Sequence, residues 1–224
     1  MNIDAVAMLQ LLQLTSPSLP VGGFAWSQGL EYAIEQAWLK DEADLCDWLE
    51  SVLAQNFTFQ EWPLLQRLSG AAMNQDWDEL IRWNRHSLAM RETAELREED
   101  RQMGAALIRL LNDLGVKQAQ DWPEHEISYL TAFAMAASSR TIPLDAAGFG
   151  FAWSWLENQI AVAIKTFLMG QTAGQRVFQT LVARIPIYWE RSLCVKEEEM
   201  GCSLPGLVMS SMLHEQQYSR LFRS

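Results

Sequence analysis

Apolar residues recur at every third or fourth position along nearly the whole chain, which is the spacing of one face of an α-helix. No turn dipeptide flanked by alternating strands occurs, so no hairpin is predicted. The pattern predicts helices over Ile3–Leu14, Trp26–Gln36, Glu42–Phe57, Trp62–Met73, Trp77–Arg91, Met103–Leu114, Ala173–Arg184, Pro186–Lys196 and Pro205–Tyr218. No repeat or low-complexity linker divides the chain. We therefore expect an all-α fold, with one domain over residues 1–224 built as a bundle of about ten helices.

Two more helices are predicted in the second half of the chain, where prolines mark their starts. Asp121 is a suitable N-cap for a helix over Pro123–Ser138. The next helix covers Pro143–Leu168 and contains Gly148 and Gly150. Glycine weakens a helix, so we expect a neighbouring helix to approach closely at these two positions.

The segment Arg91–Arg101 is dense in charge and runs without a break into the apolar Met103–Leu114. Its charged residues are Arg91, Glu92, Glu95, Arg97, Glu98, Glu99, Asp100 and Arg101. Opposite charges three and four positions apart stabilise one another on an exposed helix surface. The spacing therefore predicts a solvated helix face.

Composition narrows the classes of function. The chain of 224 residues has a formal net charge of −11, which argues against nucleic acid as a partner because phosphate binding needs a basic surface. The N-terminus has no basic region before an apolar run, and the most apolar stretches, residues 127–139 and 146–156, are too short to span a bilayer. The three cysteines form no CxxC pair, which favours reduced thiols. We expect a cytoplasmic protein that does not bind membranes.

A search for catalytic and metal-binding motifs returns near misses. The chain contains no phosphate-binding loop, and Ala25–Gly29 lacks the first glycine and the preceding strand of a nucleophile elbow. The run from His214 resembles the zinc motif HExxH, but Tyr218 stands where the second histidine belongs. Cys194, Cys202 and His214 match no familiar metal spacing, which leaves only a weak adventitious site open. We predict no catalytic residue, no dedicated metal site and no cofactor, and therefore no enzyme.

Two internal features invite a functional interpretation. Ser16–Glu31 overlaps the helix break over Thr15–Phe24, which is rich in proline and glycine. This segment is either a rigid connection with core aromatics or a recognition surface of fixed shape. Lys165 is the only charge within Ile160–Met169, so it either extends to solvent past apolar neighbours or pairs with a carboxylate of a partner.

The C-terminal residues 214–224 form the third such feature. The last seven of them include Tyr218, Arg220, Leu221 and Phe222, and chain ends are usually frayed unless something holds them. Tyrosine and arginine are enriched at the energetic centres of protein interfaces. The tail is therefore either a last helix docked on the core or an interaction element, and the residues alone favour neither.

These pieces together resemble the urease accessory protein F family (UreF). The matching stretches are Ser16-Pro17, Leu19 to Gly22, Phe24, Ser27 and Gly29 to Glu31 near the start, Arg91-Glu92, Glu95 to Arg97, Gly170 to Thr172 and Gly174-Gln175 in the middle, and His214-Glu215, Tyr218 to Phe222 and Ser224 at the end. The resemblance covers essentially the whole chain. It agrees with the all-α prediction.

The resemblance implies a non-catalytic urease accessory protein. Such proteins bind a second accessory protein, UreD or UreH, and with it recruit the GTPase UreG, which delivers nickel to apo-urease. Family members form homodimers within the complex. By resemblance, Tyr218, Arg220, Leu221 and Phe222 contact UreD/UreH, and the early segment with Pro20, Gly22 and Phe24 engages UreG. Lys165 joins the UreG surface as a hypothesis.

Two alternatives remain open at this stage. One is a GTPase-activating protein that inserts an arginine finger into UreG, for which Arg140 in the break before Pro143 is the candidate. GTP turnover by UreG separates this alternative from a scaffold. The other is an unrelated helical enzyme or cofactor bundle, and the absence of paired Glu-x-x-His motifs argues against its di-iron form.

Overall fold

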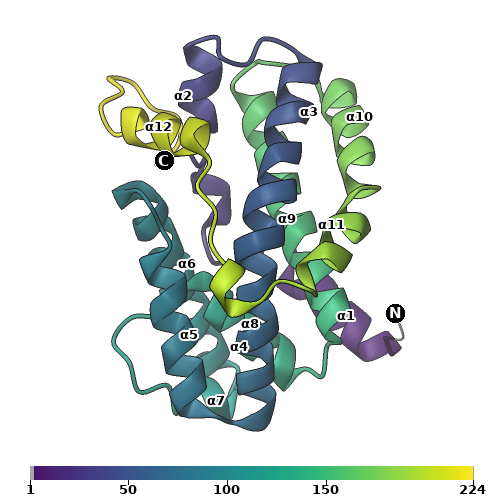
Figure 1. Ribbon diagram of the computed structural model, residues 1–224, viewed down its shortest axis with the longest axis vertical. Helices are drawn as coiled ribbons and strands as arrows, with labels where there is room; N and C mark the ends of the chain where they lie inside the picture. The colour runs from purple at the N-terminus through teal and green to yellow at the C-terminus, as the bar shows by residue number, and fades with distance from the viewer. Residues whose placement is uncertain (1–2, 224) are drawn as a thin grey trace.

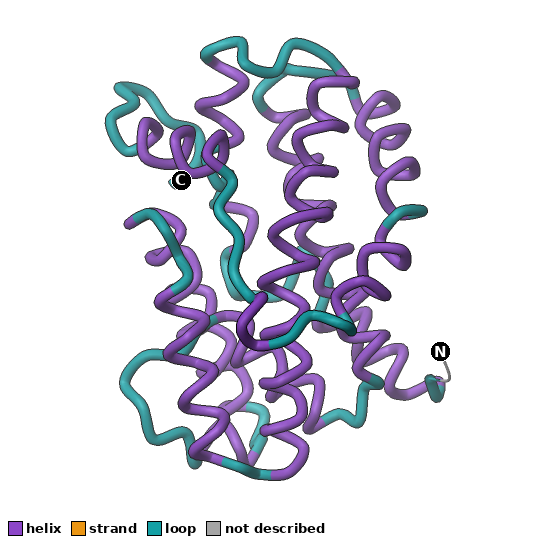
Figure 2. The backbone as a smooth tube through the Cα atoms, viewed as in Figure 1, coloured by secondary structure: helices purple, strands orange, loops and turns teal. Residues whose placement is uncertain are grey.

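A computed structural model describes residues 3–223; Met1, Asn2 and Ser224 lie outside the described residues. Within this range the chain consists of helices and loops, without strands (Figures 1 and 2). The elements are α1 Ala5–Leu14, η1 Gly23–Ala25, α2 Leu30–Glu35, α3 Glu42–Ser51, η2 Val52–Glu61, α4 Trp62–Asn74, α5 Trp77–Ala89, α6 Ala94–Asp113, α7 Lys117–Gln120, α8 Tyr129–Ser139, α9 Leu144–Lys165, α10 Gln171–Val182, α11 Ile185–Ser192, η3 Glu197–Glu199 and α12 Pro205–His214. The all-α prediction is confirmed.

The longest element is a rod made of α3, η2 and α4. The predicted gap between Phe57 and Trp62 is absent, because η2 continues the helix with wider π-type turns and the residues at both of its junctions keep helical backbone angles. With this rod taken as one helix and the four-residue α7 set aside, the described residues form the expected bundle of about ten helices. No helix among residues 3–223 combines the length and the apolar character needed to cross a bilayer.

The helices pack in two groups along the rod. Helices α5 and α8 pack against its α4 half, and α6 packs on α8, while α10 packs against its α3 half and α9 packs on α10 (Figure 1). The core is continuous between the groups through a chain of aromatic contacts. Phe57 and Trp62 of the rod meet edge to face at 5.2 Å between ring centroids, and Trp62 meets Trp189 of α11 at 5.7 Å. The C-terminal α12 lies beside α2, while the N-terminus lies on the opposite side of the molecule (Figure 1).

Two helix starts differ from the prediction. Helix α2 begins at Leu30 instead of Trp26, because Gln28 and Gly29 have the left-handed φ angles of 55° and 77°, which no helix accommodates. Helix α8 begins at Tyr129 instead of Pro123, because the Ser128 hydroxyl caps it by accepting the Thr131 N–H at 3.0 Å.

The charged segment also differs from its prediction. The side chains of Glu95, Glu99 and Asp100 are buried, so the helix face that carries them is not solvated. Arg91 precedes α6 and pairs with Glu61 and with Asp100, whose Oδ2 lies 3.3 Å from the Arg91 Nε. Only part of the segment, such as Glu98, meets solvent. Charge spacing alone does not show that other parts of the chain cover this face.

The predicted close approach at the two glycines of α9 is confirmed. A Cβ atom at Gly148 would lie 2.2 Å from the Cζ3 atom of Trp189 in α11. A Cβ at Gly150 would lie 2.7 Å from a Leu11 methyl carbon in α1. The Gly148 carbonyl also accepts the Trp62 indole N–H at 2.9 Å. Both glycines therefore allow a neighbouring helix to pack against α9.

We expect Gly148→Ala to lower the free energy of unfolding by about 1–3 kcal/mol, the usual cost of overpacking a core. The buried Trp189 ring has no space into which it can move. Gly70→Ala is the matched control in α4, where an added Cβ meets nothing within 4 Å. That change should raise the free energy of unfolding by about 0.5–1 kcal/mol, because alanine favours a helix over glycine. Urea denaturation followed by circular dichroism measures both, and equal effects of the two substitutions would contradict this packing.

Candidate functional site

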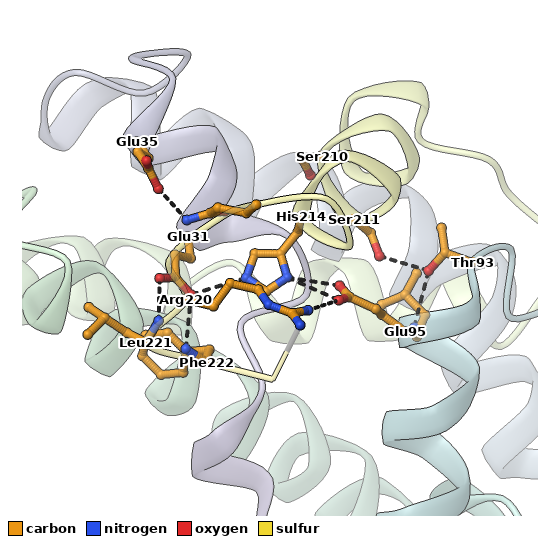
Figure 3. Close-up of polar contacts among 12 residues, drawn as sticks. Glu31, Glu35, Thr93, Glu95, Ser210, Ser211, His214, Arg220, Leu221 and Phe222 are labelled. Carbon is orange, nitrogen blue, oxygen red and sulfur yellow. Dashed lines mark hydrogen bonds and ion pairs between the residues drawn. The ribbon is translucent and has the colours of Figure 1, made fainter.

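The C-terminal tail, defined here as residues 215–223, continues without regular helix from the end of α12 and lies against α2. The backbone N–H groups of Leu221 and Phe222 donate to the two carboxylate oxygens of Glu31, at 2.7 and 3.0 Å (Figure 3). The Arg223 N–H donates to the Ala25 carbonyl at 2.8 Å. The tail is therefore ordered on the chain's own surface. Ser224, the last residue of the predicted tail, lies outside the described residues.

Local backbone geometry brings Glu31 within reach of the tail. Gly29 has φ 77°, and a Cβ at this position would lie 2.5 Å from the Ser210 hydroxyl and 2.6 Å from the Ser211 nitrogen. Glycine thus lets α12 pack directly on the start of α2. Across the same junction, the Ser211 hydroxyl bonds at 2.7 Å to Thr93, the residue that caps α6. Helices α2, α6 and α12 meet at this point.

His214 lies at the centre of this junction and is fully buried. Its Nε2 lies 3.1 Å from Glu31, and its Nδ1 lies 3.0 Å from Glu95 (Figure 3). Arg220 also donates to Glu95, at 3.0 Å. Burial lowers the pKa of His214, but the hydrogen bonds to Glu95 and Glu31 outweigh burial and raise that pKa above its ordinary value. Basic and acidic side chains therefore alternate at this junction, in the order Arg220, Glu95, His214 and Glu31.

The tail has one buried residue, which anchors it, and several exposed residues. The Phe222 side chain is only 7% exposed and belongs to the core. Leu221 is 71% exposed, and Tyr218 is fully exposed. The Arg220 side chain is partly exposed while it pairs with Glu95. Both interpretations of the tail therefore apply to different residues: Phe222 docks, and Tyr218 and Leu221 remain available for contact.

The segment over Ser16–Glu31, called the Pro/Gly segment from here on, lies next to the tail. Pro20 and Phe24 are exposed, Phe24 by 62%, and Gly22 takes the left-handed φ of 79° within the break. The bond between Arg223 and Ala25 joins this segment to the tail. The structure thus brings together two groups of residues that the resemblance assigned to different partners.

Lys165 lies at the last turn of α9 and is exposed to solvent. Its Nζ atom lies 5.5 Å from the centre of the Phe222 ring, within the range of a cation–π contact. The lysine therefore reaches solvent beside the docked tail. It remains accessible to a partner there.

A central cavity behind the Pro/Gly segment was not predicted. It has a volume of about 170 Å³, and Glu99, Gln28 and Trp155 are among its lining residues. The Trp155 indole donates to Gln28 at 2.8 Å, and the Gln28 amide donates to Glu99 at 3.0 Å. Burial raises the pKa of Glu99 to about 8. No local sequence pattern predicts this cavity, because the left-handed φ of Gln28 cannot be recognised from the residue type.

No described group of three or more His, Cys, Asp and Glu side chains could hold a metal ion. Both nitrogens of His214 face carboxylates, so this residue does not join Cys194 and Cys202 as a metal ligand. Arg140, the candidate arginine finger, is half-buried at the end of α8, where burial lowers the pKa of its guanidinium. The guanidinium is therefore only partly accessible to a partner's nucleotide.

The fold and the site together define the class of protein. It is an all-helical protein whose ordered tail and Pro/Gly segment offer exposed residues for contact with other proteins. Comparison with known proteins then identifies the family. A family model described as UreF matches residues 39–182. The chain belongs to the UreF family, whose members are urease accessory proteins and not enzymes.

Curated relatives match nearly the full length of the chain. A urease accessory protein UreF from Psychrobacter cryohalolentis is 47% identical over 227 residues, covering 99% of this chain and 96% of the relative. Another from Marinobacter nauticus is 47% identical over 219 residues, covering 98% and 95%. A third, from Hahella chejuensis, is 45% identical and covers 98% and 99%. The resemblance found in the terminal motifs is thereby confirmed.

Proposed function

We propose that this protein is a cytoplasmic, non-catalytic scaffold that joins UreD/UreH to the GTPase UreG and so regulates nickel insertion into apo-urease. Membership in a family of urease accessory proteins supports the pathway. The single observation that carries the scaffold role is the docked tail, which holds Tyr218 and Leu221 exposed while Phe222 anchors it. An exposed aromatic on an ordered support is well suited to binding, because little conformational entropy is lost on contact.

The proposed contacts follow the surface of the site. Tyr218, Leu221 and the partly exposed Arg220 contact UreD/UreH, with Phe222 as their anchor. Pro20, Gly22, Phe24 and Lys165 contact UreG. The bond from Arg223 to Ala25 joins the two surfaces, which supports a protein that holds both partners side by side.

The proposed mechanism is differential binding. A scaffold that binds one nucleotide state of UreG more tightly shifts the population of UreG toward that state, by no more than the difference in binding free energy. Within the complex the scaffold is a homodimer, so each assembly presents two copies of the tail. Nickel is the cargo of this process. No described cluster of this chain suits nickel storage.

Gel filtration tests the scaffold directly. This protein, UreD/UreH and UreG should co-elute when mixed. Failure to co-elute under every nucleotide condition would remove the proposed function.

Phe24→Ala should release UreG from the co-eluting complex while UreD/UreH stays bound. Phe24 is exposed, so its removal should leave folding unchanged, whereas loss of one interface anchor costs about 2 kcal/mol or more of binding, roughly 30-fold in affinity. Met73→Ala, an exposed apolar residue at the end of α4, is the matched control and should release neither partner. Retention of UreG by the Phe24 variant at unchanged affinity would contradict the assignment of this segment.

A further inference from the structure

His214 connects three elements through its two ring nitrogens. It lies at the end of α12, and its Nε2 faces Glu31 of α2 while its Nδ1 faces Glu95 of α6 (Figure 3). An ionised carboxylate can only accept hydrogen bonds, and a neutral imidazole carries a single N–H. Both contacts are therefore satisfied together only when the ring is a doubly protonated imidazolium.

The other partners of the two carboxylates are hydrogen-bond donors. Glu31 accepts two backbone N–H groups of the tail, from Leu221 and Phe222. Glu95 pairs with the Arg220 guanidinium. Both carboxylates thus act as acceptors toward several donors, so the geometry calls for a second proton on the His214 ring. Loss of that proton leaves two buried carboxylates with one cation and turns one His214 contact into a repulsion between lone pairs.

We propose that His214 is a pH-sensitive latch: the imidazolium holds the tail in its docked position, and deprotonation releases it. The inference goes beyond the scaffold function and does not depend on the identity of any partner. Glu31 transmits the change, because the oxygens that receive the tail's backbone N–H groups belong to the carboxylate that faces the ring. His214 is a positioning residue for Tyr218 and Leu221, which it does not touch.

The direction of the pH effect follows from the pKa. Burial lowers the pKa of His214, and the bonds to Glu95 and Glu31 raise it by more, so the folded value lies above 6.5. In the unfolded chain the imidazole titrates at about 6.5. The stabilising contribution is therefore complete below about pH 6.5 and is lost as the pH rises through the folded value. A pH above the folded pKa of His214 releases the tail, and a pH below about 6.5 holds it.

Other charged groups near the latch need their own control. Glu35 of α2 accepts a bond from the tail's Gln217, and Lys165 of α9 lies over the Phe222 ring. Glu99 lies one turn after Glu95 on α6, and its raised pKa of about 8 also lies above 6.5. Glu99 bonds to Gln28 in the Pro/Gly segment, so its ionisation could reach the tail by a separate route.

The test is a pH titration of the full chain by solution NMR, from pH 5.5 to 9. The ring signals of His214 and the backbone amide signals of Leu221 and Phe222 are followed together. We expect all three to shift with one shared midpoint above pH 6.5. In His214→Gln the pH dependence of both tail amides should disappear, because glutamine does not titrate. Glu99→Gln should leave the shared midpoint in place. His86→Gln and His125→Gln together assign the signals of the other two histidines, both exposed, and so identify those of His214 without changing them.

Several outcomes overturn the latch. A His214 midpoint at or below pH 6.5 would show that the fold does not stabilise the imidazolium. Tail amide signals that stay constant while the ring titrates would show that the ring and the tail are not coupled. Loss of the pH dependence in Glu99→Gln assigns the effect to Glu99 instead. If His214→Gln does not fold, the wild-type titration and the Glu99 variant still decide the question.

Discussion

Tyr218→Ala/Leu221→Ala will abolish co-elution with UreD/UreH while leaving the fold unchanged. Both side chains are exposed on the docked tail, so their removal should change the free energy of unfolding by no more than about 0.5 kcal/mol each. If both are central contacts, each costs about 2 kcal/mol of binding or more, which together is roughly a thousandfold in affinity. Gel filtration measures the complex, and thermal unfolding followed by circular dichroism measures the fold.

The matched control is Met73→Ala/Leu114→Ala, which removes two exposed apolar side chains, one in the last turn of α4 and one directly after α6. It should leave the complex intact. Phe222→Ala provides a contrast, because it removes the buried anchor of the tail. That variant should weaken the complex by freeing the tail, with Tyr218 and Leu221 still present. Undiminished co-elution of the double tail variant would contradict the assignment of the tail to UreD/UreH.

Arg91→Ala will produce the largest loss of stability among the charged residues discussed. The guanidinium is buried between Glu61 and Asp100, and its removal leaves two buried carboxylates without a counter-charge. Breaking a buried ion pair by removing one partner costs about 3–5 kcal/mol. Urea denaturation should show this as a lower midpoint with an unchanged slope.

Arg101→Ala is the control for this change within the same charged segment. Arg101 pairs with Glu98 and Glu126 at the surface, where an ion pair contributes about 0–1 kcal/mol. A small effect of Arg101→Ala beside a large effect of Arg91→Ala would establish that the segment has one buried and one solvated side. Equally small effects of the two substitutions on the free energy of unfolding would support the solvated face that charge spacing predicts.

Helix periodicity predicted most of the fold, and its errors have physical causes. The start of α2 was placed too early, because the left-handed backbone of Gln28 depends on its bonds to Trp155 and Glu99 far along the chain. The start of α8 was placed too early for a similar reason, because Ser128 and Asp100 fix its first turn. Such long-range contacts override the local helix preferences of the sequence.

The candidate site was only partly predictable. The tail and the Pro/Gly segment were singled out by their residue types, but their contact through Arg223 and Ala25 is long-range. Glu95 belonged to a segment interpreted as solvated, and its burial depends on α12 and the tail lying over it. The cluster around His214 joins residues 31, 95 and 214, and no spacing rule connects such distant positions.

Hydrogen–deuterium exchange, measured by mass spectrometry with and without UreD/UreH, tests most directly the central claim that the tail is the contact surface for that partner. Peptides covering residues 215–223 should exchange more slowly in the complex, while peptides from the end of α4 and from α7 stay unchanged. Tail peptides that exchange at the same rate in both states, with protection elsewhere on the chain, would contradict it.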